Sequence, residues 1–138
     1  MKAEYKFSVS SVIENLPDGD TEETSVEATG TIAEADSALT LSYSETGEGG
    51  KVDTSVKISG DCVTVVRHGA IDSHLVFREG VTESSLYSVG PYSFDASVKT
   101  RRIRNELTGD GGRLTLFYTM TVGGAEKRVR MRIIAEKA

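Results

Sequence analysis

Residues 114–133 read LTLFYTMTVGGAEKRVRMRI, and this stretch decides the fold class. Apolar or aromatic residues occupy every second position in residues 114–122 and again in residues 129–133. An alternation of period two is typical of strands with one buried face. Gly123 and Gly124 lie between the two runs, and glycine readily adopts the positive φ angles of tight hairpin turns. The stretch therefore predicts an antiparallel β-hairpin.

The same alternation continues on the N-terminal side of this hairpin. It covers residues 5–9, 26–32, 39–43, 52–58, 63–65, 71–77 and 94–98. Turn residues such as Pro17–Asp20 and Gly90–Pro91 separate the runs, and no segment keeps helical spacing for three turns. Short connections imply antiparallel pairing, because parallel strands need a crossover of a dozen or more residues. We expect one long bent strand over residues 92–107.

An antiparallel sheet this wide must curl, split into two layers or close, and only closure removes both edges. The formal charge is −9 in residues 1–50, −2 in residues 51–97 and +6 in residues 98–138, so the two ends attract each other. We therefore predict an all-β fold, a single closed antiparallel barrel of about eight to ten strands in a meander, with residues 1–138 as one domain. Closure would bring Glu23 and Glu27 near a row of outward arginines at positions 128, 130 and 132.

The composition argues against several kinds of chemistry. The chain has 138 residues, a net charge of −5, one cysteine and two histidines, which excludes a disulfide framework and leaves too few ligands for a structural zinc site. No known catalytic motif is present, so we expect no enzyme activity, no catalytic residue, no metal and no cofactor. Residues 1–11 alternate like a strand rather than forming a signal peptide, and we expect a cytoplasmic protein without a membrane association.

Some polar residues share the inward face with the apolar ones. The candidates for a ligand-binding site are Tyr43, Glu45, Thr54, Arg67 and Tyr118. In an up-and-down meander their positions along the strands bring them together at one polar end of the barrel, above an apolar floor.

Two interpretations of this cluster remain open. In the first, Arg67 and Glu45 form an internal ion pair that plugs the barrel, because a buried charge must be paired. In the second, Arg67 offers a forked donor to the carboxylate or phosphate of a small ligand, and the tyrosines line a pocket. Eight-stranded barrels can enclose one small ligand.

Arginines also form an outward row late in the chain, at positions 101, 102, 104, 128, 130 and 132. They suggest an alternative function, a non-catalytic structural or interaction module that binds a protein or RNA through these strands. Nucleic acid is not the partner that we expect, because the isoelectric point is about 5.1 and aromatic residues are sparse between the arginines. The sequence does not indicate an oligomeric state.

The order of several short motifs resembles the YwiB-like family of small bacterial β-barrels, which are grouped by fold with the calycins and lipocalins. The motifs are residues 41–45 (LSYSE), Thr54 with Val56 and Ile58, residues 65–69 (VVRHG), Ser73 with Leu75 and Phe77, Tyr87, Thr100 and residues 114–118 (LTLFY). The resemblance covers about 100 of the 138 residues. It implies a calycin-like antiparallel barrel, and it implies no activity because the family is uncharacterised.

Overall fold

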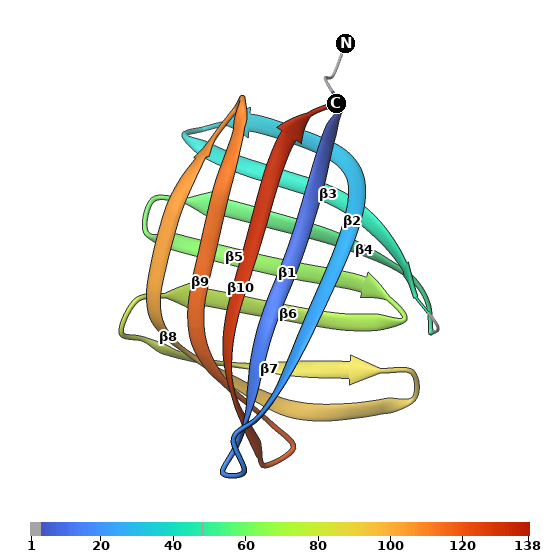
Figure 1. The fold of residues 1–138 in the computed structure, drawn as a ribbon, viewed down its shortest axis with the longest axis vertical. Helices are drawn as coiled ribbons and strands as arrows, with labels where there is room; N and C mark the ends of the chain where they lie inside the picture. The colour runs from blue at the N-terminus through green and yellow to red at the C-terminus, as the bar shows by residue number, and fades with distance from the viewer. Residues whose placement is uncertain (1–3, 48) are drawn as a thin grey trace.

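The computed structural model describes residues 4–47 and 49–138, and in these ranges it contains ten β-strands and no helix. Accordingly, these ranges hold no helix long and apolar enough to cross a membrane. The strands are β1 (Tyr5–Leu16), β2 (Asp20–Ala35), β3 (Ala38–Gly47), β4 (Gly50–Ser59), β5 (Cys62–Gly69), β6 (Ile71–Arg78), β7 (Thr82–Val89), β8 (Tyr92–Thr108), β9 (Gly111–Val122) and β10 (Ala125–Lys137). Each strand pairs antiparallel with its neighbours in sequence, and β1 also pairs with β10 (Figure 1). The predicted closed antiparallel barrel is confirmed.

The strands cross each other in two layers. In Figure 1, β9, β10 and β1 run nearly vertically at the front, whereas β3 to β7 run nearly horizontally behind them. The two longest strands, β2 with 16 residues and β8 with 17, bend and pair with both layers. This is the orthogonal way of packing two sheets, with bent strands as the corners.

Gly30 forms the corner in β2. It is opposite Tyr5 on β1 and opposite Tyr43 on β3, so that one residue joins the two layers. A Cβ atom at this position would overlap the carbonyl oxygen of Ser42 and lie 3.0 Å from the ring of Phe7. The corner therefore requires glycine, because the strands approach too closely for a side chain.

The second corner is an irregularity in β8. The pairing of β8 with β9 shifts register between Thr100 and Arg102, which leaves Arg101 as an extra residue. Such a bulge bends the strand and increases its twist. The bent strand expected over residues 92–107 is thus confirmed, with bounds at Tyr92 and Thr108.

Closure joins β1 to β10 along the full length of β1, as the charge distribution predicted. The predicted acidic partners were wrong, because β1 lies between β2 and β10. Glu23 and Arg130 are both opposite Val12, and are therefore about 10 Å apart along the sheet. The acid that pairs with the arginine row is Glu14, whose Oε1 lies 3.2 Å from Nη1 of Arg128.

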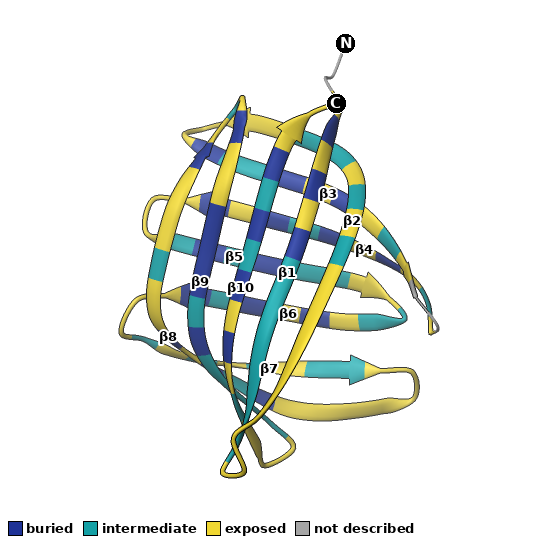
Figure 2. Cartoon of the chain, viewed as in Figure 1, coloured by how far each residue is buried: buried dark blue, intermediate teal, exposed yellow. Residues whose placement is uncertain are grey.

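Buried residues alternate with more exposed ones along β10 and over the first five residues of β1, whereas β9 has three buried residues in succession, Leu114 to Leu116 (Figure 2). The inward side chains form one apolar core. Its largest fully buried members are Phe7, Leu41, Val56, Val63, Val65, Phe77, Val98, Leu114, Leu116 and Ile133. This core occupies the inside of the barrel. Inward polar side chains are therefore exceptions, and they are the candidates for a functional site.

Candidate functional site

Five inward polar side chains lie in one row across the back strands. Tyr43 on β3 is opposite Thr54 on β4, which is opposite Arg67 on β5. Arg67 is in turn opposite Ser73 on β6, and Ser73 is opposite Tyr87 on β7. Directly opposed residues share one face of a sheet, and Tyr43, Thr54 and Ser73 are buried. The row therefore faces the barrel interior.

Tyr118 approaches the same cluster from β9, on the front layer. Its ring packs edge-on against Phe77, with ring centroids 4.7 Å apart. Burial raises the pKa of Tyr118 to about 12, while the positive charge of Arg67 acts to lower that pKa. Burial also raises the pKa of Tyr43 to about 12, again against the influence of Arg67. Arg67 is thus within electrostatic reach of tyrosines from both layers.

Three hydroxyl groups around this row are buried without a hydrogen-bond partner among the described residues. They are Oγ1 of Thr54, Oγ of Ser73 and Oγ1 of Thr100, and Thr100 is directly opposite Tyr118. The hydroxyl of Thr54 acts to lower the pKa of Tyr43, yet the two groups do not have the geometry of a hydrogen bond. A buried polar group without a partner typically costs about 1–3 kcal/mol of stability.

The ion pair that the first of the two interpretations places between Arg67 and Glu45 is not formed among the described residues. The reason lies in the register. Glu45 is opposite Val52 in the next inward row, and β4 separates its strand from that of Arg67. Glu45 still acts to raise the pKa of Tyr43, so it lies at the edge of the same cluster. The guanidinium of Arg67 is left without a carboxylate partner in the described part of the chain.

Members of the cluster differ in their access to solvent. Arg67 and Glu45 are half-buried, whereas Thr54 is 3% exposed and Thr100 is 1% exposed. Water therefore reaches the two charged residues in part, and it hardly reaches the two threonines.

The structure brings together all five residues that the sequence predicted, namely Tyr43, Glu45, Thr54, Arg67 and Tyr118. It adds Tyr87 and Thr100, which the sequence did not place in the site. Tyr87 lies in a run of small polar residues, TESSLYSV, where the alternation is too weak to define a strand or its inward face.

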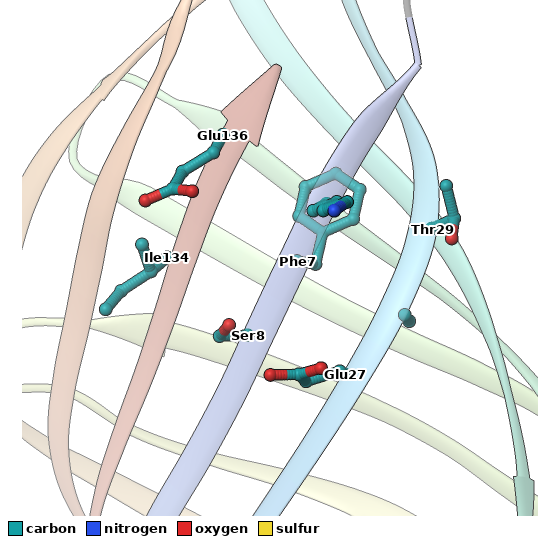
Figure 3. Close-up of a pocket in the computed structure, with 8 residues that line it drawn as sticks. Phe7, Ser8, Glu27, Thr29, Ile134 and Glu136 are labelled. Carbon is teal, nitrogen blue, oxygen red and sulfur yellow. The ribbon is translucent and has the colours of Figure 1, made fainter. Parts of the chain in front are cut away.

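The outer surface also carries hollows. One of about 430 Å³ lies over β1, β2 and β10, and Figure 3 shows Ser8, Glu27, Ile134 and Glu136 around it. Lys6 also lines this hollow and adds a positive charge to the negative charges of Glu27 and Glu136. This hollow is open to solvent and lies on the outside of strands whose inward side chains form the core, so it is separate from the cluster at Arg67.

Comparisons with known proteins agree with the barrel fold. A family model described as "Domain of unknown function (DUF1934)" matches residues 8–133. The chain is 31% identical over 121 residues to the "Uncharacterized beta-barrel protein YwiB" of Bacillus subtilis (strain 168), covering 88% of this chain and 84% of that protein. The crystal structure of the ywiB protein from Bacillus subtilis superposes with a TM-score of 0.90 at 30% identity, covering 99% of this chain and 93% of that one. The chain therefore belongs to the DUF1934 family of YwiB-like β-barrel proteins.

Proposed function

We propose that the protein is a non-catalytic cytoplasmic binding protein that holds a small anionic or amphipathic molecule inside its barrel. In this proposal, Arg67 binds the carboxylate or phosphate of the ligand. Tyr43, Thr54 and Tyr118 line the site, and Glu45 lies at its edge. The bound molecule would have an apolar part that faces the core residues next to the cluster, such as Phe77.

One observation carries this proposal. Arg67 has no carboxylate partner in the described part of the chain, and three buried hydroxyls near it have no hydrogen-bond partner there. A protein that needed only stability would fill this space with apolar side chains, because imperfectly paired buried polar groups are costly. An oxyanion accepts hydrogen bonds from both guanidinium and hydroxyl donors, so in this proposal it binds Arg67 together with the hydroxyls of Thr54 and Ser73 on the two neighbouring strands.

The fold supports the same conclusion by analogy. The chain forms a closed antiparallel barrel of ten strands, and the interior of eight-stranded lipocalin barrels is already wide enough to hold one small ligand. One fold can host many functions, and the chemistry of the cluster at Arg67 is what specifies an anionic ligand.

The test is a thermal-unfolding screen with defined probes: inorganic phosphate, acetate, benzoate and octanoate. We expect benzoate or octanoate to raise the melting temperature of the wild-type protein more than acetate does, since they add apolar contact to the same charge. At a concentration one hundred times the dissociation constant, binding stabilises the folded state by about 2.7 kcal/mol.

Arg67→Met is the decisive variant and Arg78→Met is its matched control, because Arg78 is exposed on the outer face of β6. Arg67→Met should fold, since methionine replaces the charge with an apolar chain, and it should lose the ligand-induced rise in melting temperature. Arg78→Met should keep it. The proposal is wrong if no probe stabilises the wild type, or if Arg67→Met responds as the wild type does.

A further inference from the structure

The outer face of three neighbouring strands is rich in arginine. Arg102 and Arg104 on β8, together with Arg128, Arg130 and Arg132 on β10, lie on either side of β9 and on its outward face. The extra residue of the bulge, Arg101, adds a sixth guanidinium. All except Arg132 are exposed. We call this surface the arginine face.

Phe117 on β9 lies at the centre of the arginine face. It is directly opposite Arg102 on one side and directly opposite Arg130 on the other. Phe117 is half-buried, and together with Arg101, Arg128 and Arg130 it lines an outer hollow of about 300 Å³. The ring can therefore be reached from solvent. In the sequence the phenylalanine is far from both arginine runs, and only the register of the strands places it between them.

Most arginines of this face form no ion pair with an acidic side chain among the described residues. Glu14 pairs with Arg128 at 3.2 Å, and Glu106 pairs with Arg113 rather than with the arginine face. The carboxylate of Glu79 accepts a hydrogen bond from the backbone of Ile103. Within residues 4–47 and 49–138, Arg101, Arg102, Arg104, Arg130 and Arg132 form no ion pair.

Arg132 is the half-buried member of the arginine face. Its Nε is buried and has no hydrogen-bond partner among the described residues. The donor geometry of guanidinium suits phosphate oxygens, which accept two parallel hydrogen bonds from one arginine. The net negative charge of the whole chain does not oppose this, because charges more than about 8–10 Å away are largely screened at physiological salt. The most acidic strand, β2, is separated from β10 by β1.

We propose that the arginine face binds single-stranded nucleic acid, with the arginines on the phosphates and one base stacked at Phe117. Sites for single strands combine a basic groove that follows the backbone with aromatic side chains on which bases stack, and both elements are present here. An acidic peptide would use the arginines but would gain nothing specific from an aromatic ring between them. This site is distinct from the one proposed inside the barrel, because it uses outward side chains. On β9, which contributes to both sites, Phe117 faces outward and Tyr118 faces inward.

The test is fluorescence anisotropy with a fluorescein-labelled thymidine dodecamer at several salt concentrations. We expect binding at low salt that weakens with added salt, by about 0.7 in the logarithmic slope for each phosphate contact. The double variant Arg102→Gln/Arg130→Gln should bind more weakly and should reduce the slope by about 1.4. Phe117→Leu should weaken binding by about fivefold or more at unchanged slope, because it removes stacking and no charge.

The matched control is Lys57→Gln/Arg78→Gln, which removes the same charge from exposed positions on β4 and β6 and should bind as the wild type does. Arg67→Met should also bind as the wild type does, which separates this proposal from the barrel ligand. No binding at low salt would overturn the proposal, and so would an equal loss in the control. Two results together would overturn it in favour of an acidic protein partner. Polyglutamate would displace the labelled dodecamer as well as the unlabelled dodecamer does, and Phe117→Leu would leave binding unchanged.

Discussion

Leu114 and Tyr118 lie four residues apart on the inward face of β9, and their surroundings differ. Leu114 is fully buried opposite Ile133 in the apolar core. Tyr118 is 6% exposed opposite Thr100, and its phenol lies within the electrostatic reach of Arg67. We call these two regions the apolar half and the polar half of the barrel interior.

The difference separates the residues that stabilise the fold from the residues of the candidate binding site. Apolar burial contributes about 25 cal/mol for each Å² removed from water, so the apolar half accounts for stability with few constraints on residue type. The polar half buries three hydroxyl groups that have no hydrogen-bond partner among the described residues, which lowers stability. A function provides the simplest reason to keep it, and three perturbations can test the contrast.

High pH should lower the stability of the protein through the polar half, and this is the largest effect that we expect. Tyr43 and Tyr118 have pKa values of about 12 in the folded protein because they are buried, against 10.0 when exposed. Their contribution to stability is complete below pH 10 and is lost as the pH rises through 12, at about 3 kcal/mol for each tyrosine. Urea unfolding between pH 8 and pH 12 measures the loss.

The double variant Tyr43→Phe/Tyr118→Phe is the control for that experiment. It should keep its packing and lose only the part of the alkaline destabilisation that these two phenols cause. Identical pH profiles for the variant and the wild type would show that the two phenols ionise equally easily in the folded and unfolded chains.

Removal of a large side chain from the apolar half should also lower the free energy of unfolding. Leu114→Ala leaves a cavity among fully buried neighbours and should lower the free energy of unfolding by about 3 kcal/mol, measured by urea denaturation at pH 7. Leu86→Ala is the matched control, because Leu86 is 61% exposed and its truncation should change stability by less than about 0.5 kcal/mol. Equal effects of the two variants would contradict the assignment of Leu114 to the stabilising half.

The smallest change makes the polar half more like the apolar half. Thr100→Val replaces a buried hydroxyl that has no described partner by a methyl group, and should raise the free energy of unfolding by about 1 kcal/mol. Thr29→Val on the exposed outer face of β2 removes a solvated hydroxyl and should change it much less. A loss of stability in Thr100→Val would mean that its hydroxyl is satisfied in the protein.

The fold was predictable because strand alternation and turn residues agree along most of the chain. The part that was missed has a physical cause in each case. In β7 the inward positions hold glutamate, serine and tyrosine, so burial leaves little trace in the sequence. The turn between β2 and β3 uses Asp36 and Ser37 at φ angles of 51° and 64°, without the glycine that usually marks such a turn.

The candidate site was predictable only in part, from the alternation of inward and outward residues along each strand, which we call strand parity. Parity gave the inward direction of Arg67, Thr54 and Tyr118, and meander direction put them in the same half. Neither shows which inward residues are directly opposite each other across several strands. The ion pair with Glu45 therefore stayed open as one of two interpretations, and it is not formed among the described residues. The position of Phe117 between two arginines was not predictable for the same reason, because it depends on the register of β9 against β8 and β10.

The place of β10 in the barrel has a consequence for how the protein is made. It fills the gap between β9 and β1, strands from opposite ends of the chain. A ribosome-bound chain that lacks Ala125–Lys137 would leave the edges of both β1 and β9 unpaired, and exposed edges invite pairing with other chains. During synthesis, protection from such aggregation would therefore come only with the last strand, and a premature stop before it should be more harmful than its length suggests.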